Sequence, residues 1–149
     1  MRAVVQRVIR AQVVVDEVVV GAVGAGVVVF LGVDRTDEET DAEYIANKIA
    51  GLRIFSDTQG KMNLSLMQCG GEALVVSQFT LLADCRKGRR PGFSRAASET
   101  MAANQYEAVV ERLRSLGIRV ATGVFQADMQ VDLSNDGPVT MLLDSKKEF

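Results

Sequence analysis

Valine dominates the first 33 residues of this 149-residue chain, and this bias restricts the possible folds more than any other feature. Residues 3–8 and 11–16 read AVVQRV and AQVVVD, residues 17–21 read EVVVG, and residues 27–33 read VVVFLGV. Valine is branched at Cβ and therefore favours the pleated surface of a strand over a helix. Glycines interrupt the apolar stretch between Val18 and Val33 repeatedly, so it indicates strands and not a membrane span.

Two later segments have apolar residues at helical spacing, and each has a recognisable start. The first spans residues 35–55, where Thr36 and Glu39 have the spacing of a capping box. The second runs from Ser98, a good N-cap residue, to Gly117, a good residue for ending a helix. We therefore expect two main helices.

The remaining apolar stretches predict further strands. One lies within residues 69–85, and residues 118–124, 128–133 and 139–143 follow the second helix. No linker, repeat or low-complexity segment divides the chain. We therefore expect one α+β domain over residues 1–149, with a mixed sheet of many strands.

The chain contains no histidine, which limits the chemistry it can perform. A Ser-His-Asp or Cys-His site is excluded, and so is the commonest metal ligand. Cys69 and Cys85 form no metal-binding or redox motif, so we expect no cofactor and no metal. Two cysteines, together with an N-terminal segment that does not resemble a secretory signal, indicate a cytoplasmic protein. Catalysis would have to use carboxylates, hydroxyls, lysine, backbone amides or a group of the substrate.

The formal net charge is −2, whereas a general nucleic-acid binder is usually basic. Any contact with nucleic acid must therefore be local. Residues 86–95, RKGRRPGFSR, contain five cationic residues and no acid. This segment is either an ordinary solvated loop or a loop that binds phosphate groups through Arg86, Lys87, Arg89 and Arg90.

Residues 75–84, VVSQFTLLAD, place Ser77, Gln78 and Thr80 on or at the end of a buried strand. Polar side chains in such a place need hydrogen-bond partners. Neighbouring backbone could satisfy them, which would make the segment purely structural. Alternatively, hydroxyls and amides gather there to form a site in which backbone N–H groups hold an oxyanion. The local chemistry leaves both interpretations open.

Residues 131–144, VDLSNDGPVTMLLD, contain Gly137 and Pro138 between two flanks that resemble strands. A plain turn is one interpretation. The other is a cis peptide bond, because X-Pro bonds are the ones that adopt the cis form. A cis Gly-Pro unit flanked by strands would project two backbone carbonyl groups in a fixed direction.

These last two segments resemble the two signature motifs of the D-aminoacyl-tRNA deacylase family. The motifs are SQFTL at residues 77–81 and NDGPVT at residues 135–140. Other stretches fit the same family in the same order: QRV near the start, then GLRIFSDTQGKMNLSL, KGRRPGFS and ADMQVDL. The resemblance covers essentially the whole chain, and two separated motifs make it specific.

The resemblance implies a barrel-like β core and a homodimer with its active site at the subunit interface. Ser77, Gln78, Phe79 and Thr80 would form the catalytic segment and line the pocket for the 3′-terminal adenosine and its aminoacyl ester. Gly137 and Pro138, joined by a cis bond, would reach in from the partner subunit. Their carbonyl groups would leave space for a D-side chain and clash with an L-side chain. The partner molecule implied is the 3′ end of aminoacyl-tRNA, held by the basic loop.

The expected activity is hydrolysis of the ester bond of D-aminoacyl-tRNA to free D-amino acid and tRNA, a proofreading reaction. Mischarged Gly-tRNA is expected to enter as well, because glycine has no side chain to reject. Two other functions compete with this one. The chain could be a non-catalytic RNA- or DNA-binding module of the same fold, or a hydrolase of small amino-acid esters. A structural dimer without a site would leave the Gly-Pro pair unexplained.

Overall fold

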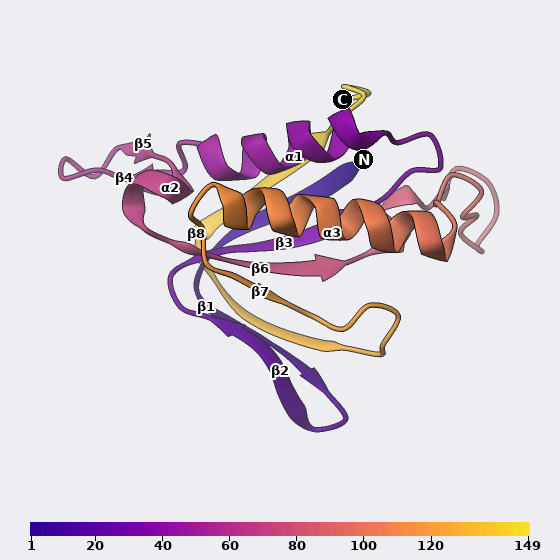
Figure 1. Ribbon diagram of the computed structural model, residues 1–149, viewed down its shortest axis with the longest axis horizontal. Helices are drawn as coiled ribbons and strands as arrows, with labels where there is room; N and C mark the ends of the chain where they lie inside the picture. Colours follow the sequence, from indigo (N-terminus) through magenta and orange to yellow (C-terminus); the bar gives the residue numbers. More distant parts are fainter.

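The computed structural model describes residues 1–149 and contains a bent mixed sheet with helices on one face (Figure 1). In chain order the elements are β1 (Arg2–Val15), β2 (Val18–Val23), β3 (Gly26–Gly32), α1 (Glu39–Gly51), β4 (Phe55–Ser56), β5 (Met62–Leu64), α2 (Leu66–Cys69), β6 (Glu72–Ser77), the 3₁₀ turn η1 (Phe79–Leu82), α3 (Glu99–Ser115), β7 (Val120–Thr122) and β8 (Gln130–Asp144). The expected α+β class is therefore confirmed.

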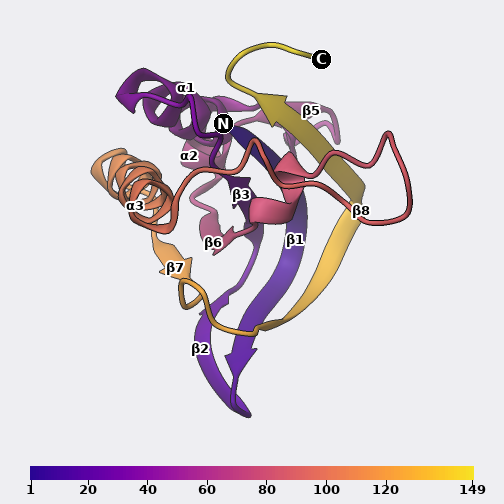
Figure 2. The same cartoon turned by 90° about the vertical axis from the view of Figure 1, so that its right-hand side faces the viewer.

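Strand β1 organises the sheet because it pairs along nearly its whole length on both edges. Strand β8 runs antiparallel along one edge, and β3 followed by β2 runs antiparallel along the other. Strands β6 and β7 extend the sheet beyond β3 in parallel pairs. The lower half of the sheet bends back toward β7 (Figures 1 and 2). There Gly21 of β2 lies against the backbone carbonyl of Thr122, too close for a Cβ atom, which gives the sheet its barrel-like closure.

Two apolar cores lie on opposite faces of this sheet. In the larger core, Val5, Val29 and Val75 of the sheet pack with Ile45 of α1 and Leu113 of α3. Helices α1 and α3 lie side by side over this face (Figure 1).

The smaller core lies beneath the bend, where Val13 and Val23 of the lower half pack with Val28, Leu74 and Val76. Burying both faces of β3 and β6 explains their near-continuous valine and leucine runs.

Several boundaries differ from those predicted from the sequence. The first helix is capped by Glu38 and Asp41, not by Thr36 and Glu39, and it ends at Gly51. The two stretches predicted at residues 3–8 and 11–16 form the single strand β1. Likewise, the last two predicted strands form the single strand β8, which includes the Gly-Pro pair.

The N-terminal amino group is tied into the structure. It is buried, and it donates hydrogen bonds to Asp37 Oδ1 at 2.5 Å and to Ser145 Oγ at 2.7 Å. None of the helices combines the length and the apolar character that a membrane-spanning helix requires.

Candidate active site

The SQFT segment lies where strand β6 gives way to the turn η1. Ser77 is the last residue of β6, and the N–H of Gln78 still donates to the carbonyl of Leu31 at 2.8 Å. The chain then turns over the end of β3, where Gly32 allows a close approach. A Cβ atom at Gly32 would lie 2.9 Å from the carbonyl oxygen of Gln78. A residue without a side chain is therefore needed to hold η1 against the sheet.

Two backbone N–H groups at the start of η1 have no acceptor in the protein. Within the turn, Leu81 N donates to the carbonyl of Gln78 at 3.2 Å, and Ala83 N donates to the carbonyl of Thr80 at 3.1 Å. The N–H groups of Phe79 and Thr80 precede these bonds and donate to no protein atom. The first N–H groups of any helical turn lack partners within it. They are therefore free to bind a ligand oxygen.

A cavity of about 580 Å³ opens beside this turn. It lies between the end of β6, the N-terminal end of α3 and the segment that leads into β8. Its lining residues are Val76, Ser77, Gln78, Phe79, Ala96, Ala97, Glu99, Ala102, Phe125, Gln126, Ala127, Asp128, Met129 and Val131. Nine of these 14 residues are hydrophobic and the others supply polar groups, as in a site for a small organic group.

The polar side chains of the segment pair with each other. Gln78 Nε2 donates to Thr80 Oγ1. Thr80 is exposed and stands outside the cavity lining, directly after Phe79. No lysine, carboxylate or other basic group bonds to its hydroxyl.

The wall of the cavity is fixed by Tyr106 of α3, whose hydroxyl donates to the carbonyl of Val75 at 2.8 Å. Burial raises the pKa of Tyr106, so its phenol remains a protonated donor. This bond ties α3 to the strand that carries Ser77.

Gly137 and Pro138 lie on a bulge of strand β8. The register pairs Val8 with Asn135 and Gln6 with Thr140, so residues 136–139 stand opposite Arg7 alone. The Gly137–Pro138 peptide bond is cis, and both residues are exposed. Bulges of this kind re-aim a strand and are common beside active sites.

Side chains fix the base of the bulge. Asn135 Nδ2 donates to the carbonyl of Arg7 at 2.8 Å and to that of Val139 at 3.0 Å. Arg7 Nη1 donates to the carbonyl of Ile54, just before β4. Arg7 Nε lies 2.9 Å from Asp136 Oδ2, an ion-pair distance, although its N–H does not point at that oxygen. The Gly-Pro bulge therefore rests on an arginine held from two sides.

The two motifs do not meet within one chain. Strands β6, β3, β1 and β8 follow one another across the sheet, so Ser77 and Gly137 are three strand spacings of about 4.8 Å apart. The register also pairs Ser77 with Leu31 but Arg7 with Val27, which adds roughly 13 Å along the strands. Neither Gly137 nor Pro138 lines the cavity beside Ser77.

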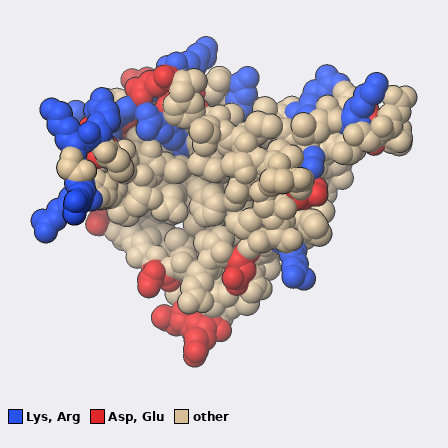
Figure 3. Space-filling model, turned by 180° about the vertical axis from the view of Figure 1, so that it is seen from behind, with Lys and Arg blue, Asp and Glu red and all other residues tan.

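The basic loop projects from one end of the sheet directly after η1. Figure 3 shows Lys and Arg side chains gathered at that end, while acidic side chains gather at the tip of the β1–β2 hairpin. Asp84 and Gly92 close the loop with two backbone hydrogen bonds of 2.7 and 2.9 Å. Phe93 then packs edge-on against Phe79, with ring centroids 5.0 Å apart. The loop is thus anchored beside the cavity.

The four cations predicted to bind tRNA are not equivalent. Arg86 forms two hydrogen bonds to the carboxylate of Asp84, at 2.8 and 2.6 Å, and these bonds lower the pKa of Asp84. Lys87, Arg89 and Arg90 are exposed and form no ion pair. They are therefore free for an external anion, whereas Arg86 is already paired.

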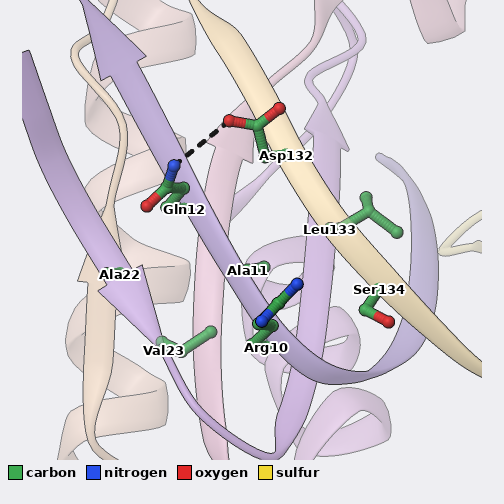
Figure 4. Close-up of a pocket in the computed structure, with 8 residues that line it drawn as sticks. All are labelled: Arg10, Ala11, Gln12, Ala22, Val23, Asp132, Leu133 and Ser134. Carbon is green, nitrogen blue, oxygen red and sulfur yellow. Dashed lines mark hydrogen bonds between the residues drawn. The ribbon is translucent and has the colours of Figure 1, made fainter.

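A second cavity, of about 610 Å³, lies on the lower half of the sheet (Figure 4). It is lined by Arg10, Ala11, Gln12, Ala22, Val23, Asp132, Leu133 and Ser134. Gln12 Nε2 donates to Asp132 Oδ2 at 3.2 Å across the β1–β8 pair. It contains none of the residues predicted for catalysis.

Of the residues that line the first cavity, the sequence predicted only Ser77, Gln78 and Phe79. Ala96, Ala97 and Ala102 form one wall, and Phe125 and Met129 form another. Small or apolar residues of this kind carry no chemical signal in a sequence. One weak signal was Gly123, where a Cβ atom would lie 2.6 Å from Met129 Sδ. A glycine there marks a close approach.

Comparison with known proteins places the chain in a family. The family model for D-Tyr-tRNA(Tyr) deacylase matches residues 4–144. The D-aminoacyl-tRNA deacylase of Anaeromyxobacter dehalogenans is 62% identical, and that of Syntrophotalea carbinolica is 60% identical. Both alignments cover 149 residues, which is all of this chain and all of each relative.

Solved structures agree with the fold. A structure titled c-Myc DNA Unwinding Element Binding Protein superposes with a TM-score of 0.91 at 41% identity, covering 97% of this chain and 98% of that one. A probable eukaryotic D-amino acid tRNA deacylase superposes with a TM-score of 0.80 at 20% identity over 95% of this chain and 97% of that one, which supports the fold alone. The chain therefore belongs to the D-Tyr-tRNA(Tyr) deacylase family and is an enzyme of that family.

Proposed function

We propose that this chain, as one domain over residues 1–149, hydrolyses the ester bond of D-aminoacyl-tRNA to free D-amino acid and tRNA. The observation that carries the proposal is the pair of unpartnered N–H groups of Phe79 and Thr80 beside the cavity. The relatives support the substrate, because those at 55–62% identity over the full chain are named D-aminoacyl-tRNA deacylases.

The chemistry suits a chain without histidine. Water attacks the ester carbonyl carbon, and the carbonyl oxygen becomes an oxyanion held by the N–H groups of Phe79 and Thr80. Each such donor lowers the barrier by about 3–4 kcal/mol in comparable sites. The bond from the carbonyl carbon to the ribose oxygen then breaks, and that oxygen takes the proton that the water gives up. The neighbouring ribose hydroxyl orients the water, so no side-chain base is required.

Ser77, Gln78 and Thr80 position the substrate in this proposal. The Gln78 side chain donates to the Thr80 hydroxyl, so these two side chains hold each other in place. Thr80 has no base beside it, and a hydroxyl without an adjacent base is a weak nucleophile.

The site is completed by a second copy of the chain in this proposal. Gly137 and Pro138 are exposed, project from a bulge and lie on the order of 20 Å from Ser77 in the same chain. In a homodimer they would enter the partner's cavity, with their carbonyl groups facing the aminoacyl Cα. A filter made of backbone rejects an L-side chain whatever its chemistry, and it selects by repulsion of the wrong ligand. Glycyl-tRNA would also be accepted.

The charge distribution fits a protein that grips only the end of a tRNA. Lys87, Arg89 and Arg90 are the free cations of the basic loop, and Arg86 contributes through the shape of the loop. Few phosphate contacts give modest affinity with a shallow salt dependence. Because aminoacyl-tRNA is the substrate, we also infer a proofreading role in the cytoplasm.

Matched D-Tyr-tRNA and L-Tyr-tRNA test the proposal most directly, with EDTA present and Gly-tRNA as a third substrate. We expect rapid release of tyrosine from the D-ester, slower release of glycine, and none from the L-ester. Equal hydrolysis of both tyrosyl esters would contradict the filter. Hydrolysis that EDTA abolishes would contradict the backbone mechanism.

A second function has one observation in its favour. A solved structure at 41% identity and TM-score 0.91 is titled a DNA unwinding element binding protein. The same basic loop could hold DNA without any catalysis. In that case the protein would bind a labelled single-stranded DNA tightly and release neither tyrosyl ester.

A further inference from the structure

Arg2 joins the start of the chain to the candidate active site. Its Nη1 donates to the carbonyl of Leu81 at 3.2 Å, at the carboxyl end of η1. Its Nε donates to Asp144 Oδ2 at 3.0 Å, at the end of β8. The guanidinium therefore holds the same turn whose opposite end presents the unpartnered N–H groups of Phe79 and Thr80.

The tail after β8 returns to this arginine. Glu148 Oε2 accepts hydrogen bonds from Arg2 Nη2 at 2.8 Å and from Arg95 Nη1 at 2.7 Å, while its Oε1 accepts from Arg95 Nη2 at 2.9 Å. Phe149 stacks on Arg2, with the guanidinium carbon 5.5 Å from the ring centroid. One carboxylate thus connects two arginines that lie 93 positions apart in the sequence, residues 2 and 95.

Arg95 leads into the opposite wall of the cavity. Its Nε donates to the buried carboxylate of Asp34 at 2.8 Å, and its own carbonyl accepts from the N–H of Arg35 at 2.8 Å. The next two residues, Ala96 and Ala97, line the cavity. Arg95 therefore fixes that wall just as Arg2 fixes the turn.

We propose that Glu148 is a positioning residue for the deacylation, because its carboxylate clamps Arg2 and Arg95 together and so sets the distance between η1 and the Ala96–Ala97 wall. This inference depends on the proposed function, because the distance between η1 and the Ala96–Ala97 wall matters for deacylation only if the cavity binds the aminoacyl ester. The contacts are partly exposed: 41% of the Glu148 side chain is accessible, against 23% for Arg2 and 38% for Arg95. Exposed ion pairs contribute little to global stability. Loss of the Glu148 contacts should therefore change the local position of η1 and leave the fold intact.

The carboxylate suits this role in charge as well as in shape. Hydrogen bonds from Arg95 lower the pKa of Glu148, so the group stays ionised. A glutamine at this position would keep one acceptor oxygen but lose the charge and the two-oxygen contact with Arg95. Planar pairing of a guanidinium with both oxygens gives geometry that a single bond does not.

The test uses Glu148→Gln and Glu148→Asp in the full chain, with Lys147→Gln as the matched control in the same tail. The side chain of Lys147 forms no hydrogen bond or ion pair. Single-turnover rates and KM are measured for D-Tyr-tRNA and for the D-tyrosyl ester of adenosine, which lacks the rest of the tRNA. Amide hydrogen exchange is followed at Ala83, whose N–H bonds to Thr80.

We expect Glu148→Gln to reduce the single-turnover rate threefold to thirtyfold on both esters, with KM for D-Tyr-tRNA within twofold and Tm within a few degrees. Ala83 should exchange faster, Glu148→Asp should recover part of the rate, and Lys147→Gln should match the wild type. An unchanged rate on both esters overturns the proposal. So does a rate loss without faster exchange at Ala83, or a change confined to KM for the tRNA. If the wild type cleaves neither D-ester, the proposed function fails, while the exchange measurement still tests the clamp.

Discussion

Arg7 lies 2.9 Å from Asp136 across the base of the bulge that presents Gly137 and Pro138. The same guanidinium also donates to the carbonyl of Ile54, in the short segment between α1 and β4. Arg7 therefore connects the bulge to that segment. The side chain of Arg7 is only 11% accessible, whereas that of Asp136 is 47% accessible. A largely shielded guanidinium therefore supports an exposed backbone feature.

Replacing Arg7 by lysine should loosen the bulge, since one ammonium group cannot both donate to the carbonyl of Ile54 and lie beside the carboxylate of Asp136 as the longer, planar guanidinium does. We expect kcat/KM for D-Tyr-tRNA to fall about tenfold, with a stability loss of about 1 kcal/mol from the weakened hydrogen bond to Ile54. Arg10→Lys is the matched control, because Arg10 is exposed on the same strand and forms no ion pair. Equal activity of the two variants would show that the bulge does not depend on Arg7.

Gly137→Ala should disturb the bulge directly. Gly137 has a φ of +119°, and a Cβ atom would lie 2.9 Å from Val139 Cγ2 and 3.1 Å from Arg7 Nη2. We expect kcat/KM for D-Tyr-tRNA to fall about 100-fold, which is the typical loss when the groups around a reacting bond are displaced by about 1 Å. Gly60→Ala is the control, because Gly60 also has a positive φ but has no atom within 4 Å. Activity equal to that control would argue against a role for the bulge.

Thr80→Val tests whether the hydroxyl attacks the ester. If Thr80 only positions the turn, the variant should retain turnover within about tenfold, because the N–H groups that hold the oxyanion remain. Burst kinetics and single-turnover rates on D-Tyr-tRNA measure this. A complete loss of turnover with unchanged tRNA binding would instead favour a nucleophilic threonine.

Arg89 and Arg90 should account for much of the salt dependence of tRNA binding. Replacing both by alanine should reduce the slope of log K against log salt concentration by about 1.4, since each phosphate contact with a single strand contributes about 0.7. The control is the double Arg112→Ala and Arg114→Ala variant, which removes the same charge from the last turn of α3, outside the basic loop. An equal change in slope for both variants would indicate a long-range charge effect and not a binding loop.

The sequence predicted where strands and helices occur, but it did not show which predicted strands join into one continuous strand. The valine stretches of β1 were correctly assigned to strands, but Arg7, Ile9 and Arg10 hid the fact that one strand continues through them. The pairing of β1 with β8 shifts register between Gln6 and Val8 and again between Val8 and Arg10, so the continuous strand depends on how it pairs with β8. Such long-range pairing is not encoded in any local pattern.

The candidate site, like the fold, could be predicted from the sequence only in part. Ser77 to Thr80 were predicted at a strand end, because polar residues after an apolar run are visible in the sequence. The pairing of Arg86 with Asp84 was visible only as two nearby charges, and the Glu148 clamp was not visible at all. Its members lie at residues 2, 95 and 148, and only the fold brings them together.

Asp41 provides a prediction about pH. Burial raises the pKa of Asp41, but hydrogen bonds from the Lys146 ammonium and the N–H of Glu38 outweigh that effect and lower the pKa to about 2. The ordinary value is 3.8, so the folded state binds this proton more weakly than the unfolded state does. The stabilisation is therefore complete above about pH 4 and is lost as the pH falls toward 2.

Asp41→Asn should consequently lower the free energy of unfolding by about 1–2 kcal/mol at pH 7, a range that allows for the exposure of Lys146. Urea unfolding at pH 7, 5, 4 and 3 should show the difference from wild type holding steady down to pH 4 and narrowing below it. Glu43→Gln on the exposed face of the same helix provides the control, with a change within about 0.5 kcal/mol. A difference that stays constant to pH 3 would mean that the loss comes from the shape of the cap and not from the charge of Asp41.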